Sequence, residues 1–188
     1  MKNIDCLSLK MKSESRAAWN YILQKGFWIV GPAGNSVRDF VKKTLGYDDD
    51  ILDEQVRTIF LNNSPVDSID GVYVEEGAKL ALGGAMPGLV GIVMGRDNPY
   101  KEFRSGISCK ETEGAGGSSQ QVRVFLKIFS TLAVATGTDI LTKGLELKAE
   151  ALRDFLEKQK VHLLNPEVLT SLDSTDDAPV RFTVEFIN

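Results

Sequence analysis

The fold is decided by residues 31–65, GPAGNSVRDFVKKTLGYDDDILDEQVRTIFLNNSP. After the opening glycine-rich turn, apolar residues recur at i, i+3, i+4 and i+8 counted from Val37, which is the spacing of one helix face. Ser36 can cap the first turn of such a helix, and Gly46 stands where a left-handed residue would end it. The sequence therefore predicts a helix over 36–45.

Shorter patterns on both sides predict the remaining elements. Ser13 or Ser15 can cap a helix that Gly26 ends, and the apolar residues of 147–158 fit a second helix. Segment 129–143 fits helix or strand equally well. The predicted strands are 4–11, 27–30, 56–61, 91–94, 122–128 and 180–186, with 62–65 as a turn and 72–74 joined to 80–82 as a short hairpin.

Composition and charge exclude several classes of protein. The 188 residues are 43% hydrophobic and 26% charged, which suits one globular domain with a real core. The net charge is −4 and the basic residues are scattered, so no nucleic-acid partner is expected. Cys6 and Cys109 are far apart and match neither a disulfide framework nor metal spacing, which favours a cytoplasmic setting. The absence of an apolar leader or a spanning apolar run favours no membrane contact.

The turn before the predicted helix is the first candidate site. Gly31, Gly34, Asn35 and Ser36 lie between a strand and a helix start, where backbone N–H groups attract anions. The turn has no lysine of the GxxxxGK[ST] type, and it is too short for the dinucleotide pattern GxGxxG. A tight turn with a helix cap explains the same residues, and we favour this simpler interpretation.

A second candidate is the uncharged stretch GGAMPG at residues 83–88. Glycines let a partner backbone approach closely, and methionine supplies an adaptable apolar contact. Gly83, Gly84, Met86, Pro87 and Gly88 are therefore a candidate partner interface. The alternative is a bulged, tightly packed segment of the core.

No catalytic set is recognisable from spacing. His162 is the only histidine, and Cys109 would become a nucleophile only if the fold placed the two side by side. The acidic residues of 48–54 lack the ligand alternation of a calcium loop. We therefore expect no catalytic residue, no metal and no cofactor.

Residues 27–84 resemble the β-grasp (ubiquitin-like) fold in the order of their elements. The order is strand, glycine turn, helix, strand, polar turn and hairpin, and TIFLNNSPV (58–66) with VEEGAKLAL (74–82) is most similar to the sulfur-carrier proteins of thiamine and molybdopterin synthesis. The resemblance implies a functional Gly-Gly, because those carriers end in a Gly-Gly that is activated as a thiocarboxylate. Gly83-Gly84 is internal, so a carrier role would need cleavage after Gly84, and we assign no sulfur transfer to it.

These patterns together predict an α+β fold with a mixed β-sheet. Residues 1–97 are expected to form a β-grasp-like portion with an N-terminal helix, 98–121 a mobile glycine-rich loop, and 122–188 a further set of strands and helices packed on the first or merged with it. The expected function is a non-catalytic protein-interaction or assembly module, with a partner protein or a second copy. The alternative is an enzyme or a small-ligand or anion-binding protein with its pocket between the two halves.

Overall fold

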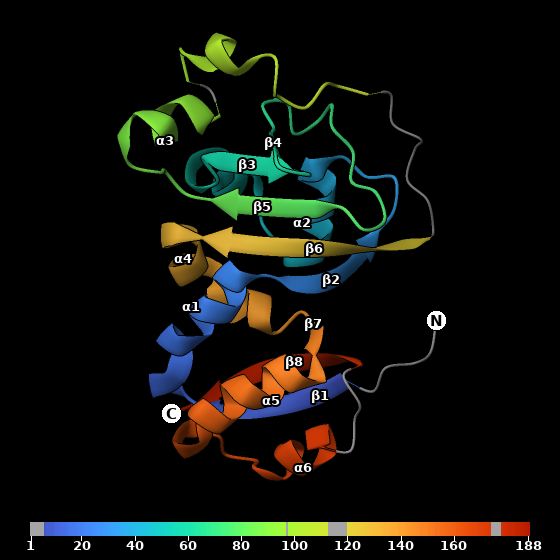
Figure 1. Cartoon of the computed structure of the whole chain (residues 1–188), viewed down its shortest axis with the longest axis vertical. Helices are drawn as coiled ribbons and strands as arrows, with labels where there is room; N and C mark the ends of the chain where they lie inside the picture. Colours follow the sequence, from blue (N-terminus) through green and yellow to red (C-terminus); the bar gives the residue numbers. More distant parts are fainter. Residues whose placement is uncertain (1–5, 97, 113–119, 174–177) are drawn as a thin grey trace.

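The protein is an α+β fold built on one mixed sheet of eight strands, seen in a computed structural model that describes residues 6–96, 98–112, 120–173 and 178–188 (Figure 1). The order across the sheet is β1-β8-β7-β2-β6-β5-β3-β4. The strands are β1 (Cys6–Lys12), β2 (Phe27–Pro32), β3 (Thr58–Leu61), β4 (Ser64–Pro65), β5 (Lys79–Gly83), β6 (Gln121–Phe129), β7 (Leu145–Lys148) and β8 (Pro179–Ile187). The helices are α1 (Arg16–Lys25), α2 (Val37–Leu45), α3 (Gly88–Met94), α4 (Ser130–Leu141), α5 (Ala149–Lys158) and α6 (Glu167–Asp173), with short turns η1 (Ser13–Ser15), η2 (Ile51–Gln55), η3 (Lys101–Arg104) and η4 (Lys160–His162).

The sheet interleaves strands from the two ends of the chain. β1 pairs with β8 and β5 pairs with β6 in parallel, and the other neighbours are antiparallel. β2 and β7 are joined at one pair only, Trp28 opposite Glu146. The C-terminal strands therefore extend the sheet of the N-terminal portion and do not build a second sheet of their own.

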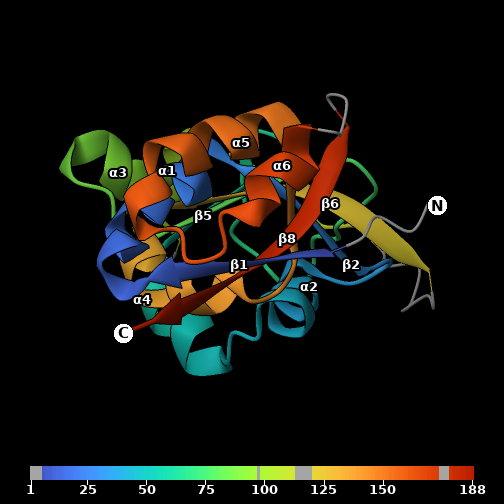
Figure 2. The ribbon, with the colours of Figure 1, turned by 90° about the horizontal axis from the view of Figure 1, so that it is seen from below.

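Helices lie on both sides of the sheet. In Figure 2, α2 and α5 lie on opposite sides of the strands. α2 packs against β2, α1 against α4, and α5 against α6 and β7. Trp19 of α1 joins these layers, because its ring lies 4.6 Å from Phe155 of α5 and 5.9 Å from Phe182 of β8, centroid to centroid. The core is thus continuous between the two ends of the chain.

The predicted helix over 36–45 is confirmed together with its caps. Ser36 Oγ accepts a hydrogen bond from the Asp39 N–H at 3.2 Å, and Gly46 ends the helix in the left-handed region at φ 78°. The strands predicted at 122–128 and 180–186 are also confirmed, with buried residues alternating with less buried ones along each. Local signals sufficed in these three places.

Two predicted elements are wrong, the hairpin of 72–74 with 80–82 and the strand at 91–94. β3 and β6 occupy both edges of β5, so 72–74 cannot pair with 80–82 as a hairpin. Instead 72–74 runs beside the start of α2, where the Val37 N–H donates to Val72 O. The segment 91–94 is not a strand and lies within helix α3.

Three other segments are now resolved. The ambiguous 129–143 contains helix α4, and the segment 147–158 begins in strand β7, so its helix starts only at Ala149. The described part of 98–121 holds turn η3 and is bonded to the body of the protein through Cys109 N to Pro65 O at 2.8 Å. The rest of the predicted glycine-rich loop, 113–119, lies outside the described residues.

Candidate functional site

The turn before α2 uses its own polar groups to hold the helix in place. The N–H groups of Val37 and Arg38 donate to Val72 O and Ile69 O at 2.8 and 3.0 Å, and that of Asp39 donates to Ser36 Oγ. The amide of buried Asn35 donates to the carbonyls of Pro32 and Ala33. An anion would need N–H donors that these hydrogen bonds within the protein already use. The anion site therefore stays a prediction, and this geometry does not favour it.

Gly31 has a packing role in this turn. A Cβ built on Gly31 would lie 2.6 Å from Cε2 of Phe40 and would also collide with Thr44. Both residues belong to α2, so the missing side chain is what lets the helix lie close on β2. Gly34 has φ +68°, which suits a tight turn.

His162 and Cys109 lie at opposite edges of the sheet. Cys109 Sγ is 3.6 Å from the carbonyl oxygens of Leu61 and Ser64, at the β3–β4 edge. His162 follows α5, and its Nδ1 is 3.8 Å from Glu14 beside β1 at the other edge. Burial raises the pKa of the Cys109 thiol, which disfavours the thiolate. The two residues cannot form a nucleophile–base pair.

Two carboxylates of the acidic run at 48–54, those of Asp49 and Asp53, are paired with cations of the protein. Arg38 of α2 contacts Asp49, Asp53 and Asp70 at 3.0, 3.2 and 2.8 Å, and the bond to Asp53 is the main cause that raises the Arg38 pKa. A hydrogen bond from Lys42, 2.6 Å away, is the main cause that lowers the Asp49 pKa. Across the described residues no group of three or more histidine, cysteine, aspartate or glutamate side chains could hold a metal ion.

The second predicted site divides into a buried and an exposed half. Gly83 and Gly84 are buried, and Thr58 donates to the Gly84 carbonyl at 3.3 Å, so a protease reaches this bond only after local opening. Met86 is half-buried, whereas Pro87 and Gly88 are exposed at the start of α3. Close packing therefore accounts for Gly83 and Gly84, while a partner interface at Met86, Pro87 and Gly88 stays a prediction.

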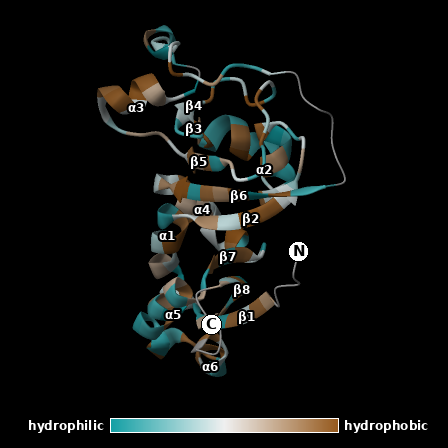
Figure 3. Ribbon diagram, turned by 45° about the vertical axis from the view of Figure 1, so that its right-hand side comes forward, coloured by the Kyte–Doolittle hydropathy of each residue, from teal (hydrophilic) through white to brown (hydrophobic). Residues whose placement is uncertain are grey.

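An apolar surface continues beyond Gly88, the last residue of the predicted interface. Figure 3 shows α3 as a largely hydrophobic helix that projects past the sheet. Leu89 is 74% exposed, Val90 67%, Ile92 50% and Phe103 84%. We call these four, with Tyr100 and Ile107, the apolar protrusion. The sequence signal for this surface is the uncharged run 81–95, part of which was predicted to be a strand. Among the described residues, no helix is both long enough and apolar enough to cross a membrane.

Two buried arginines hold the protrusion at its base. Arg104 donates to both carboxylate oxygens of Asp67, at 2.9 and 2.6 Å, and to the Val93 and Gly95 carbonyls at 2.6 and 3.0 Å. Arg96 donates to the carbonyls of Leu52 and Val56 at 2.9 and 3.1 Å. Leu89, Val90 and Ile92 of α3 are therefore apolar and exposed, while the C-terminal end of the helix is fastened by charged hydrogen bonds.

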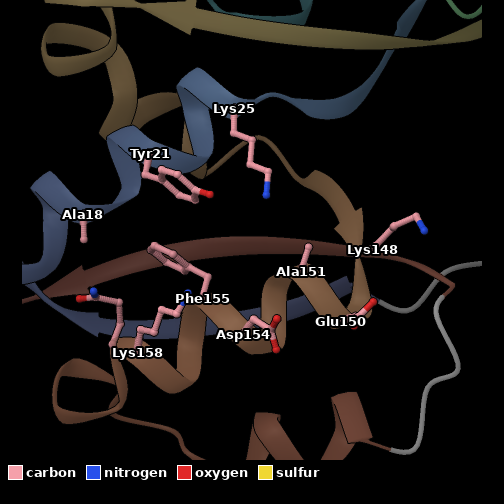
Figure 4. A pocket seen from close by; sticks show the side chains of 10 residues that line it. Ala18, Tyr21, Lys25, Lys148, Glu150, Ala151, Asp154, Phe155 and Lys158 are labelled. Carbon is pink, nitrogen blue, oxygen red and sulfur yellow. The ribbon is translucent and has the colours of Figure 1, made fainter.

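A groove of about 560 Å³ runs between α1 and α5 (Figure 4). Tyr21 and Lys25 extend from α1 toward α5, opposite Phe155 and Ala151. The groove also carries carboxylates and amines, so both charge signs flank an apolar floor. Its lining is Ala18, Tyr21, Lys25, Lys148, Glu150, Ala151, Asp154, Phe155, Lys158 and Gln159. This lining offers binding groups but no thiol, hydroxymethyl or imidazole side chain for catalysis.

Comparison with known proteins adds no relative to these observations. No protein-family model matches the chain, and neither a curated protein nor a solved structure gives a significant match.

Proposed function

We propose that this protein is a protein-interaction module that binds its partner through the apolar protrusion. The observation that carries the proposal is the exposure of Leu89, Val90 and Ile92 on a helix whose base is fastened by buried Arg104. Scattered apolar side chains are ordinary on a surface, whereas a contiguous apolar group on one projecting element marks a contact site.

The anchoring by arginine favours recognition by a preformed helix. Holding a binding element in its bound shape lowers the entropy that association has to overcome. Leu89, Ile92 and Val93 stand at i, i+3 and i+4, the spacing by which a helix fills an apolar groove of another protein. In this proposal helix α3 inserts into an apolar groove, and that groove belongs to the partner protein.

The partner is a different protein and not a second copy. Two copies meeting through α3 alone would bury little surface, since stable interfaces bury roughly 800 Å² per partner. The large groove of this chain, between α1 and α5, is flanked by charged residues such as Lys25, Glu150 and Asp154, which do not complement aliphatic side chains.

The β-grasp interpretation belongs to the same proposal. Its support is the subset β2-β6-β5-β3-β4, in which two parallel central strands, β5 and β6, are flanked by antiparallel strands and α2 packs on β2. A β-grasp sheet has this arrangement, although here the strand that would come first in the chain is β6, which comes last. The likeness concerns the fold, and the interaction role rests on the protrusion.

Site-specific photo-crosslinking in cells tests the proposal. A photo-reactive amino acid replaces Leu89 or Ile92 in the full chain, and the matched control replaces Val134, which is 71% exposed on α4. We expect one discrete protein adduct from both protrusion positions and none of that mass from position 134. Adducts that are identical at all three positions, or adducts to lipid only, would overturn the proposal. An adduct between two copies of the chain would show that the protrusion mediates self-association and does not bind a different protein.

The groove between α1 and α5 favours a second candidate, a small zwitterionic ligand. Its volume falls in the range of ligand pockets, roughly 300–1,000 Å³, and amines and carboxylates lie on its rim above Phe155. Thermal unfolding with each of the common amino acids as probe tests this candidate. A saturable rise in melting temperature that Lys25→Ala abolishes supports it, and the absence of any rise excludes this ligand class.

A further inference from the structure

A second surface lies on the open face of the sheet, away from both the protrusion and the groove. Val122, Val124, Leu126 and Ile128 of β6 are buried on the α2 side, so the alternate residues Arg123, Phe125 and Lys127 point to the opposite face. In Figure 1 this face of β5, β6 and β2 looks toward the viewer, and α2 lies behind it. The side chains on it are only partly covered.

Strand pairing assembles aromatic and basic residues on this face. Phe125 stands between Trp28 of β2 and Lys79 of β5 in the register. In the next row, Lys127 is beside Ala81, which is beside Phe60 of β3. We call this the aromatic–basic face; its members are Trp28, Phe60, Lys79, Arg123, Phe125 and Lys127.

The aromatic rings and cations of this face are in mutual contact. Trp28 and Phe125 meet edge to face at 5.3 Å, and Arg123 lies 4.6 Å above the Trp28 ring. Lys127 Nζ is 5.9 Å from the Phe125 ring. A hollow of about 220 Å³ separates Phe60 from Phe125, and Asn63, Lys79 and Lys127 line it too. Flat rings, a polar amide and two ammonium groups thus converge on one small depression.

The charge of this face is opposite to that of the protein as a whole. Arg123 is paired with Glu146 at 2.6 Å, and its backbone N–H donates to Glu76. Within the described part of the chain, neither Lys79 nor Lys127 has a carboxylate at ion-pair distance. A protein of net charge −4 therefore keeps uncompensated cations beside aromatic rings, which complements an anionic, aromatic ligand.

We infer that the aromatic–basic face binds a short segment of single-stranded nucleic acid. A base stacks in the hollow between Phe60 and Phe125, and the flanking phosphates contact Lys79 and Lys127. Stacking on sheet aromatics needs unpaired bases, and two cations are too few to hold a duplex. The net charge of −4 argues against binding that neutralises many phosphates along a nucleic acid. A site that contacts only two phosphates does not need such a basic surface.

Fluorescence anisotropy of the full-length protein with a labelled oligouridine at low salt tests the inference. We expect saturable binding whose log–log salt slope is about −1.4, since each phosphate contact of a single strand contributes about −0.7. The double variant Lys79→Ala/Lys127→Ala should weaken binding at least tenfold. Phe125→Leu keeps an apolar side chain but removes the ring, and it should weaken binding by about 5- to 150-fold.

The matched control is Lys10→Ala/Lys12→Ala, which removes the same charge from β1 at the far edge of the sheet. This control should bind like the unaltered protein. No saturable binding, an equal loss in the two lysine double variants, or a duplex bound as tightly as the single strand would overturn the inference. So would an oligoglutamate peptide that competes equally well while Phe125→Leu has no effect, because the face would then bind an acidic protein segment.

Discussion

The ion pair of Arg104 and Asp67 controls how firmly the apolar protrusion is held, and its removal has a calculable cost. The Arg104 side chain is 2% exposed, and it meets both oxygens of the Asp67 carboxylate. Removing one partner of a buried pair costs about 3–5 kcal/mol, because the remaining charge is left uncompensated. The Asp67 side chain is 29% exposed, so water screens part of this loss. We therefore expect Asp67→Asn to lower the free energy of unfolding by about 2–3 kcal/mol.

Urea denaturation and hydrogen exchange together measure this effect. Asp70→Asn is the matched control, since it makes the same chemical change in an exposed pair with Arg38, where Asp70 is 67% exposed. Its cost should stay below about 1 kcal/mol. The amides of 88–108 should exchange faster in Asp67→Asn than in Asp70→Asn, because the lost anchor lies under that segment.

Equal unfolding free energies and equal exchange in the two variants would refute this reasoning. The ion pair would then not hold the base of α3 in place. The protrusion would then lack the preorganisation that the proposed binding requires, whatever partner is found.

Three further predictions concern the body of the protein. Gly31→Ala should destabilise the fold by about 1–3 kcal/mol, because the new methyl group collides with Phe40 and Thr44, whereas Gly106→Ala meets open space and should be neutral in the same thermal unfolding assay. Burial raises the pKa of Tyr47 to about 12 from an ordinary 10.0, so the neutral phenol is favoured in the fold and its contribution is lost as pH rises from 10 through 12. Tyr47→Phe should therefore flatten the alkaline fall of the unfolding free energy by on the order of 2 kcal/mol, and an unchanged alkaline profile would contradict the assignment. The Cys109 thiol, whose pKa burial raises, should react with iodoacetamide more slowly than exposed Cys6 at neutral pH; mass spectrometry of the two peptides decides, and equal rates would show that Cys109 is not shielded.

Sequence reasoning succeeded where structure is determined by near neighbours. Helix α2 follows from Ser36, Gly46 and an apolar stripe, all within one short segment. β6 and β8 follow from alternation alone. The α+β class follows from such elements, because each needs a second layer to cover its apolar face.

The errors arose where distant pairing decides. Apolar β-branched residues at 91–94 favour a strand, but Gly88–Met94 forms helix α3 instead. Nothing near 72–74 indicates that this segment serves the N-terminus of α2. The partner of Arg104 lies 37 positions away at Asp67, so burial of an arginine inside a predicted loop has no local signal.

The aromatic–basic face was hidden from sequence for a similar reason. Trp28, Phe60, Lys79 and Phe125 come from four different strands, and only the sheet register brings them together. In sequence they are isolated residues with ordinary surroundings. The turn predicted to bind an anion is the opposite case, because its residues are clustered in sequence. The packing of α2 on β2 and the cap of α2 explain its glycines and polar residues.

Topology explains why the connection between β5 and β6 is long, but not what its side chains are. Adjacent parallel strands need a crossover that returns the chain to the starting end of the sheet, and residues 84–120 supply it. A crossover that served only this purpose would be most stable with polar residues outward. Here Leu89, Val90 and Ile92 face solvent on a helix held by buried charges, which adds exposed apolar area without any gain in fold stability. Because the fold does not need this surface, it is the part of the molecule for which we propose a partner protein.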